Sequence, residues 1–305
     1  MLQYIFKRVF YTVITIFIIS SLTFLLMNLI PGGPFLSEKS PTPAVLEAMN
    51  EKYGLDQPLI IQYKNYMVKL VQGDLGVSIK KKGRSVNDII AEKFPVSARI
   101  GGLAIIVAII FGISMGAIAA LNRGKWFDSI IMFFATMGIS VPSFVVATTL
   151  MIFFGVNLKI LPTYGLNSPL HYILPVFSLA FYPTAYISRL MRSSMLDVLN
   201  QDYIRTARAK GLAPLVVLFK HALRNAILPV VTYLGPSIAF ILTGSFVVER
   251  IFTIPGLGGE FISSITNRDY PLIMGTTIFL ATLLVVMNVV VDILYKLIDP
   301  RVNLK

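Results

Sequence analysis

The chain has 305 residues, of which 55% are apolar and 14% are charged, and its mean hydropathy is +0.75. Soluble domains carry roughly 25% charged residues, so this composition excludes a disordered chain and argues against a soluble enzyme. The sequence has no cysteine, which excludes a disulfide scaffold, thiolate metal sites and a cysteine nucleophile. The net charge of +12 fits the bias of basic residues towards the cytoplasmic side of a membrane better than it fits nucleic-acid binding.

Six uncharged runs are long enough to cross a bilayer, since a spanning helix needs about 20 mostly apolar residues. A backbone in lipid must satisfy its own hydrogen bonds, so each run is predicted to be helical. The alternation typical of a membrane barrel does not occur. An all-α polytopic membrane protein is therefore predicted, with spans at 9–30, 100–122, 129–158, 160–188, 225–248 and 270–291.

The first run has the positive flank of a secretory signal peptide, Lys7 and Arg8. It is longer than the apolar region of a signal peptide, about 7–15 residues, and residues 28–34 show no small-residue cleavage pattern. Residues 1–30 are therefore expected to form a retained first helix.

The placement of Lys and Arg predicts the orientation of the spans. With the N-terminus inside, the inner segments hold 14 of the 27 basic residues and the two short outer loops hold 3. The other 10 lie in residues 31–99, a segment long enough to escape the positive-inside rule. Both termini are predicted to be cytoplasmic.

Residues 31–99 are expected to form a folded extracytoplasmic insertion between the first helix and a five-helix core, 100–305. Residues 57–71 place apolar side chains at helical spacing, and Ser85 with Asp88 resembles a capping box at the start of another helix. The basic turn at 80–84 is either a solvated loop or a contact with a partner or anionic lipid.

The cytoplasmic loop at 189–225 holds 7 of the 14 inner basic residues. Its residues 202–210 are polar and helix-prone, Gly211 ends that helix, and Pro214 can begin a second short one. Apolar residues follow at 215–218. The pattern fits two structures equally well: a docking surface for a protein partner and an amphipathic helix lying on lipid.

Two stretches of this loop, DYIRTARAKGL at 202–212 and KHALRNAILP at 220–229, resemble the EAA loop of bacterial ABC importer permeases. The resemblance is closest to the peptide group, which carries oligopeptides, dipeptides or nickel. Pro34 with Phe35, and residues 85–88, are more similar to the oligopeptide members. Further matching stretches follow in order over nearly the whole chain: LIPG at 29–32, YGLDQP at 53–58, GDLG at 73–76, SVPSF at 140–144, PGLG at 255–258, RDYP at 268–271, VDILY at 291–295 and DPR at 299–301.

The resemblance implies that loop 189–225 holds a coupling helix seated in a groove of a cytoplasmic ATPase subunit. The sequence departs from the general motif, because residues 205–207 stand where Glu-Ala-Ala is expected and residues 221–224 replace a later Ile-x-Leu-Pro. Glycine would allow a sharp turn, small residues would permit close approach, and basic residues could pair with carboxylates on the ATPase. The residues expected to couple are Arg205, Thr206, Ala207, Arg208, Ala209, Lys210, Gly211 and His221.

Polar residues and prolines within the spans are candidates for the translocation path or its gate. Pro142 frees a carbonyl group and predicts a kink in the third span, which serves either packing or gating. A path for peptides of varied sequence needs hydrogen-bonding groups rather than fixed charges. The candidates are Ser140, Pro142, Ser143, Tyr182, Tyr186, Thr243 and Ser245.

Two glycine-rich patterns carry structural predictions. Residues 255–259, Pro-Gly-Leu-Gly-Gly, are expected either to dip back into the membrane as a hairpin or to form a plain outer turn. Gly112, Gly116 and Ala120 form a stripe of small residues on the second span, which predicts a helix-packing face.

The chain is not expected to hydrolyse ATP itself. A Walker A motif needs Gly-x4-Gly-Lys-Ser/Thr, and the sole Gly-Lys pair here, Gly124 and Lys125, is followed by Trp126. ATP and Mg are therefore expected on partner ATPase subunits, with no cofactor or metal in this chain. The spans carry no ionisable group at their centres, which argues against the alternative of an independent secondary carrier.

The resemblance implies the permease fold of type I ABC importers, in a multi-pass subunit of the bacterial inner membrane. The expected function is to form half of the translocation pathway of an ATP-driven importer for oligopeptides; dipeptides, nickel or other solutes are alternatives for the same fold. The expected partners are a second homologous permease subunit in a heterodimer, two ABC ATPase subunits, an extracytoplasmic solute-binding protein contacting residues 31–99, the peptide substrate and the lipid bilayer. No nucleic acid is expected.

Overall fold

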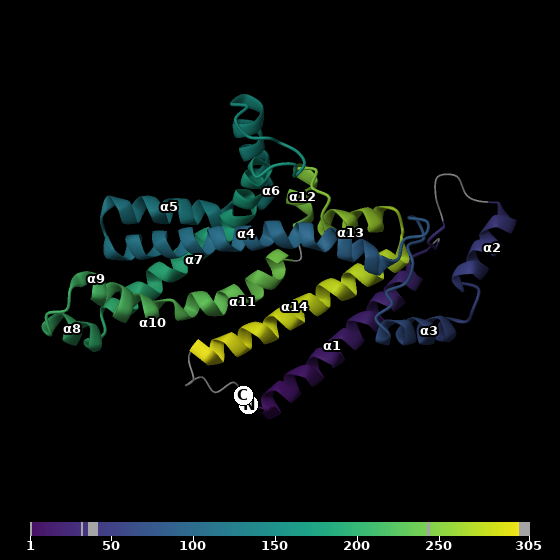
Figure 1. The fold of residues 1–305 in the computed structure, drawn as a ribbon, viewed down its shortest axis with the longest axis horizontal. Helices are drawn as coiled ribbons and strands as arrows, with labels where there is room; N and C mark the ends of the chain where they lie inside the picture. The colour runs from purple at the N-terminus through teal and green to yellow at the C-terminus, as the bar shows by residue number, and fades with distance from the viewer. Residues whose placement is uncertain (1, 32, 36–41, 243–244, 299–305) are drawn as a thin grey trace.

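The computed structural model describes residues 2–31, 33–35, 42–242 and 245–298, and this part of the chain is built almost entirely from helices (Figure 1). Its β structure is one isolated bridge, between Val77 and Ser85, so the predicted all-α class is confirmed. The long helices are α1 (Leu2–Leu29), α4 (Val86–Leu121), α7 (Leu170–Leu199), α11 (Leu228–Leu242) and α14 (Tyr270–Ile298). The shorter α-helices are α2 (Pro43–Tyr53), α3 (Leu59–Val71), α5 (Trp126–Ser140), α6 (Ser143–Leu150), α8 (Asp202–Ala209), α9 (Pro214–Val216), α10 (Arg224–Ala226), α12 (Phe246–Ile251) and α13 (Leu257–Thr266), and the π-helical turns are η1 (Met151–Asn157) and η2 (Val217–Leu223).

Helical stretches of the described residues match the predicted spans in number and order. Five of them have the length and apolar character to cross a membrane, and a bent pair of helices makes a sixth if the pair is counted as one span. The five are Phe6–Leu29, Val86–Leu121, Leu170–Leu199, Leu228–Ile251 and Tyr270–Val290.

The third predicted span is broken rather than kinked. Helices α5 and α6 with η1 meet at an angle of 109°. Pro142 lacks an amide hydrogen and precedes the first residue of α6, while Val141 before it adopts an extended backbone, with φ −86° and ψ 125°. A residue before proline is pushed out of the helical region, so this dipeptide accounts for the break.

Three other span boundaries differ from the sequence prediction. Helix α7 begins at Leu170 rather than at residue 160, because the preceding segment is irregular and takes positive φ at Lys159 (55°) and Gly165 (81°). Helix α7 also continues to Leu199, so the first part of loop 189–225 is helical. Helix α4 begins at Val86 and passes without a break through the proposed domain boundary at residues 99 and 100.

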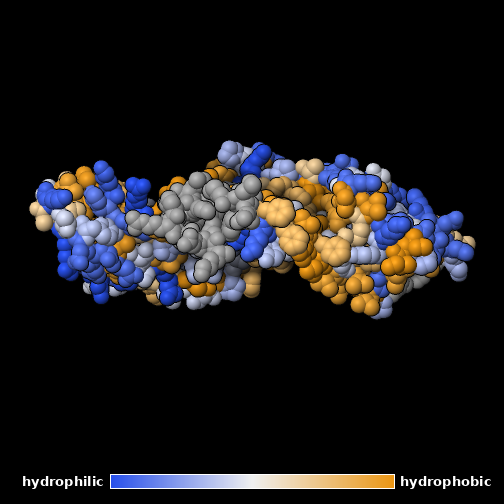
Figure 2. All heavy atoms as spheres, turned by 90° about the horizontal axis from the view of Figure 1, so that it is seen from below, coloured by the Kyte–Doolittle hydropathy of each residue, from blue (hydrophilic) through white to orange (hydrophobic). Residues whose placement is uncertain are grey.

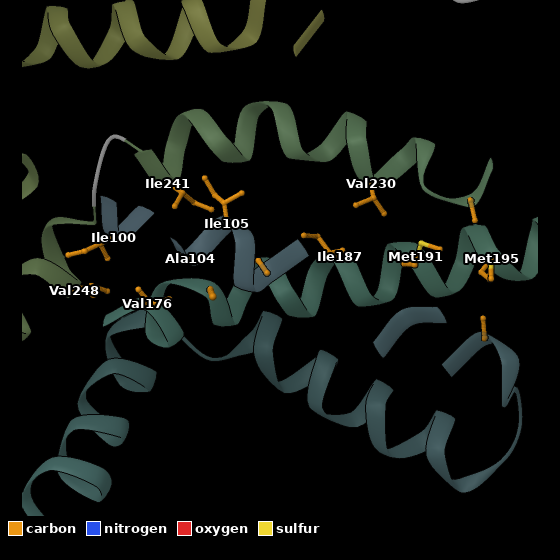
Figure 3. Close-up of a cluster of buried hydrophobic side chains, with 14 of the residues drawn as sticks. Ile100, Ala104, Ile105, Val176, Ile187, Met191, Met195, Val230, Ile241 and Val248 are labelled. Atoms are coloured by element: carbon orange, nitrogen blue, oxygen red, sulfur yellow. The ribbon is translucent and has the colours of Figure 1, made fainter. Parts of the chain in front are cut away.

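The main hydrophobic core lies between α4, α7 and α11 and extends into the short helices at both ends. In Figure 3, Ile105 of α4 lies beside Ile241 of α11, and Val230 of α11 points toward the part of α7 that carries Ile187 and Met191. The same cluster includes Ile204 of α8 at one end and Val248 of α12 at the other. The loop at 189–225 and the far end of the fifth span therefore share one continuous core.

Helices α4 and α7 approach each other along the predicted stripe of small residues. A Cβ atom at Gly112 would lie 2.7 Å from the Cβ of Ile187, and one at Gly116 would lie 2.5 Å from the carbonyl oxygen of Ser188. Ala120 is buried in the same core. The packing face predicted for the second span is thus confirmed, and any larger residue at these glycines would push the two helices apart.

The insertion at 31–99 has the local structure expected from its sequence. Helix α3 covers Leu59–Val71, and the hydroxyl of Ser85 caps α4 by accepting a hydrogen bond from the amide of Asp88 at 3.0 Å. The ring of Tyr63 packs against Phe24 of α1 with centroids 5.4 Å apart. Lys81 in the basic turn pairs with Glu260 of α13 at 2.6 Å, so part of that turn is an intramolecular contact.

A buried aspartate fastens the insertion to the start of α14. The carboxylate of Asp269 accepts hydrogen bonds from the hydroxyl of Ser78 and from the backbone amides of Ile79, at 3.1 Å, and Lys80, at 3.4 Å. All its donors belong to the insertion. The segment around residue 78 is therefore held against the core rather than free in solution.

Residues 255–259 do not form a plain turn on the surface. Leu257 begins helix α13, and Leu257 and Gly258 are buried. Helix α13 contacts α4, α12 and α14. The segment is thus an integral part of one end of the helical core.

The coupling loop and the insertion lie at opposite ends of the elongated molecule. Figure 1 places α8 and α9 at one end and α2 and α3 at the other. In Figure 2 hydrophilic residues gather at the end where α8 lies, and an apolar surface follows the course of α1. Many apolar side chains of α1 are exposed, including Phe10, Phe17 and Leu25, as expected for a helix in lipid.

Candidate coupling loop and translocation path

The coupling loop is a compact turn between two short helices. Helix α8 has Asp202 in its first turn and Arg208 in its last. Each charge therefore interacts favourably with the end of the helix dipole beside it. Gly211 then adopts φ +76°, and a Cβ atom there would meet no atom within 4 Å. The glycine is therefore required for its backbone conformation rather than for space. Pro214 begins α9 at the N1 position, as the sequence predicts.

Helix α8 has one face in the core and one face in solvent. Ile204 and Ala207 are buried, and Tyr203 accepts a hydrogen bond from the side-chain amide of Asn225 at 3.0 Å, which ties α8 to α10. Ala207 therefore positions the helix and does not offer a surface to a partner. The predicted coupling residues that are exposed are Arg205, Thr206, Arg208, Ala209, Lys210 and Gly211, and His221 on η2 is partly exposed.

The exposed surface of the loop combines positive charge with apolar side chains. Arg205 pairs loosely with Asp202 at 3.6 Å, and both side chains are largely exposed, so this pair contributes little to stability. Beyond the turn, Leu215 and Phe219 are 67% and 61% exposed. An apolar strip beside basic residues at the tip of the molecule is suited to a protein groove with carboxylates on its rim.

An ion pair that the sequence analysis missed braces the stem of the coupling loop. The guanidinium of Arg192, on α7, donates to both carboxylate oxygens of Asp128, on α5, at 2.6 and 2.7 Å. The amide of Gly124 adds a third hydrogen bond at 3.0 Å. Asp128 is buried, and bidentate pairs of this kind are among the stronger hydrogen-bonded contacts. One feature of the sequence could have indicated this ion pair: Asp128 is the sole acidic residue between Glu92 and Asp197.

The structure brings two of the predicted path residues together and adds a third. The rings of Tyr182 and Tyr186 on α7 lie 6.3 Å apart, and Tyr186 stacks on Tyr233 of α11 at 4.3 Å. Tyr182 is 44% exposed and Tyr186 is 37% exposed, although both lie near the middle of α7. Tyrosine in a span is typical of the membrane interface, so exposed tyrosines near the middle of α7 are unusual for a surface that faces lipid.

The other path candidates lie elsewhere. Ser140 and Ser143 are exposed on either side of Pro142 at the break between α5 and α6, and Ser140 donates to the carbonyl of Thr136 at 3.0 Å. Ser245 caps α12 by accepting from the amide of Val248 at 3.4 Å. Thr243 lies outside the described residues.

Comparison with known proteins identifies the class. Residues 109–304 match the family described as the binding-protein-dependent transport system inner membrane component, and residues 1–101 match the corresponding N-terminal family. The chain belongs to this family. It is therefore a permease subunit and a multi-pass protein of the bacterial inner membrane.

Individual relatives match over their full length. The chain is 50% identical over 304 residues to the dipeptide transport system permease protein DppB of Bacillus subtilis (strain 168), covering 100% of this chain and 99% of that protein. It is 45% identical over 305 residues to the oligopeptide transport system permease protein OppB of Haemophilus influenzae (strain ATCC 51907 / DSM 11121 / KW20 / Rd), covering 99% and 100%.

Solved structures show the same fold at low sequence identity. An inward-facing structure of the MetNI methionine ABC transporter superposes with a TM-score of 0.55 at 14% identity, covering 69% of this chain and 96% of that chain. An amino acid ABC transporter crystallised with histidines gives a TM-score of 0.51 at 20% identity, covering 71% and 95%. The predicted ABC permease fold is thereby confirmed.

Proposed function

We propose that this chain is one of two homologous permease subunits of an ATP-driven peptide importer, and that it forms half of the translocation pathway. Relatives named for dipeptide and for oligopeptide transport match it over their whole length, which supports a peptide cargo. The sequence features at Pro34, Phe35 and 85–88 favour oligopeptides. The remaining subunits would be the second permease, two ATPases and a solute-binding protein.

The observation that carries this proposal is the coupling loop. Its exposed small and basic residues form the tip of the molecule, while its buried residues Ile204 and Ala207 belong to the main core. A partner ATPase that closes on ATP would push on this tip. Because the core is close-packed, the push would reach α7 and α11 as a rigid-body movement.

The path itself is assigned to the tyrosine face of α7 and α11. Phenol groups can donate and accept hydrogen bonds without a fixed charge, which suits a peptide backbone whose side chains vary. The break at Pro142 would act as a gate between α5 and α6. ATP and Mg would be held by the ATPase subunits, so this chain contributes movement and a path rather than chemistry.

The proposal is tested by purifying the tagged chain from its native membranes and assaying ATP hydrolysis in the eluate. We expect two ATPase subunits and a second permease to co-purify, and we expect activity to rise when binding protein and peptide are added. A chain that elutes alone and transports peptide without ATP would instead support an independent secondary carrier. Comparison of dipeptides with longer peptides in the same assay fixes the cargo.

A further inference from the structure

Helix α13 begins without a capping side chain of its own. Its N-cap residue is Gly256, yet the first amides of a helix need acceptors. Two side chains from other helices supply them. The amide of Leu257 donates to the hydroxyl oxygen of Ser97 on α4 at 2.8 Å, and the amide of Gly259 donates to Glu249 on α12 at 2.9 Å.

Glu249 is the centre of this arrangement. Its residue is only 3% exposed, and its second carboxylate oxygen accepts a hydrogen bond from the hydroxyl of Ser97 at 2.7 Å. Both oxygens thus receive hydrogen bonds from neutral donors. These donors are an amide and a hydroxyl, so they hold the carboxyl group in place without bringing a positive charge to it. The N-terminal end of α13 adds a favourable dipole.

The Pro-Gly-Leu-Gly-Gly segment at 255–259 has the shape that this carboxylate requires. A Cβ atom at Gly256 would lie 2.5 Å from a carboxylate oxygen of Glu249 and 2.6 Å from the hydroxyl oxygen of Ser97. One at Gly258 would lie 3.1 Å from the same carboxylate oxygen and 2.9 Å from the amide nitrogen of Phe246. The glycines therefore make room for Glu249, which explains why they stand at these positions.

The carboxylate joins three helices where the fifth span ends away from the coupling loop, near the middle of the molecule's long axis (Figure 1). Helix α12 contacts α6 and α7, and α13 contacts α4 and α14. Between α12 and α13, Phe252 and Ile254 are buried in the main core. The segment 252–256 thus packs over the core at this end, and Ser97 and Glu249 together link it and the start of α13 to α4.

We propose that Glu249 is a positioning residue for transport: by capping α13 from α12, it keeps this end of the path closed until α12 moves. This inference rests on the proposed function, because it assigns a role within the transport cycle. When the fifth span shifts, the carboxyl group moves α13 with it. The opening of this end of the path is then linked to a movement that begins at the coupling loop. Without the carboxylate, segment 252–256 would open independently of the ATPases.

The test uses a cysteine introduced as a reporter. Because the natural chain has no cysteine, the introduced thiol is the one site of labelling in this chain. Ile254→Cys places the thiol in the buried segment, and the complex is labelled with maleimide in native membranes. Glu249→Gln and Ser97→Ala are each expected to raise the labelling rate about tenfold, the effect of leaving one buried hydrogen-bonding group without its partner. Ser97→Thr keeps the hydroxyl and should retain the slow rate. Glu92→Gln, on the exposed surface of α4, is the matched control.

The second measurement is peptide uptake per ATP hydrolysed by the reconstituted complex. Glu249→Gln is expected to raise ATPase activity in the absence of binding protein and to lower uptake per ATP about tenfold. Unchanged labelling in both variants would overturn the proposal, and so would faster labelling with normal uptake per ATP, which would make Glu249 purely structural. If the proposed function itself were wrong, the wild-type complex would show no peptide uptake. That result differs from the results that would overturn the role of Glu249.

Discussion

Gly116→Ala should weaken the packing of α4 against α7, whereas Gly102→Ala in the same helix should not. A Cβ atom at Gly116 would lie 2.5 Å from the carbonyl oxygen of Ser188 and 2.7 Å from the Cβ of Met191. Neither atom can move without shifting α7. A Cβ atom at Gly102 would meet no atom within 4 Å. This variant therefore shows the effect of replacing glycine by alanine in the helix without a steric clash.

The magnitude follows from comparing the two variants. Replacing a helical glycine by alanine stabilises a helix by roughly 0.5–1 kcal/mol, and this gain is common to both. Overpacking of a close interface costs about 1–3 kcal/mol, and it applies only to Gly116. The difference in the free energy of unfolding between the variants is therefore expected to be about 1–3 kcal/mol.

Thermal unfolding of the purified protein in detergent, followed by the loss of helical circular dichroism, measures this difference. We expect the midpoint of Gly116→Ala to lie below that of Gly102→Ala by at least about 2 °C, using the shift per kcal/mol typical of large domains. A midpoint for Gly116→Ala equal to or above that of Gly102→Ala would refute the close approach of the two helices.

Three further predictions concern coupling and the path. Gly211→Leu, forced into a left-handed backbone that costs about 1–2 kcal/mol, should leave membrane insertion intact but reduce peptide uptake; wild-type uptake would contradict the role of the turn. Asp128→Asn leaves Arg192 without its carboxylate and should destabilise the complex by roughly 1.5–3 kcal/mol, measured by thermal unfolding; the charge swap Asp128→Arg with Arg192→Asp should recover part of the loss, and recovery of none would argue against a direct pair. Tyr186→Leu should reduce uptake more than Tyr186→Phe, which keeps the stacked ring, and equal uptake in both would remove the ring from the path.

Features that depend on local sequence were predictable. The spans follow from runs of apolar residues, because the cost of burying charge in lipid decides them residue by residue. The turn of the coupling loop follows from Gly211 and Pro214, whose backbone preferences act whatever surrounds them. The cap at Ser85 is equally local, since its partner is three residues away. The packing stripe on α4 was visible because helical periodicity places its glycines on one face.

Features that depend on contacts between distant residues needed the tertiary structure. Asp128 and Arg192 are 64 residues apart, and Ser97 and Glu249 are 152 residues apart; nothing in the sequence pairs them, because hydrogen bonding depends on positions that only packing fixes. The dipeptide at 141–142 interrupts the helix locally, but the angle of 109° between its two parts also depends on the packing of α6 against α7 and α12. The sequence alone thus determined which segments are apolar enough to span a membrane, where the loop at 189–225 turns and which family the chain resembles. Packing decided which buried charges meet and which face of α7 keeps its tyrosines exposed, because both depend on how separate helices are placed in space.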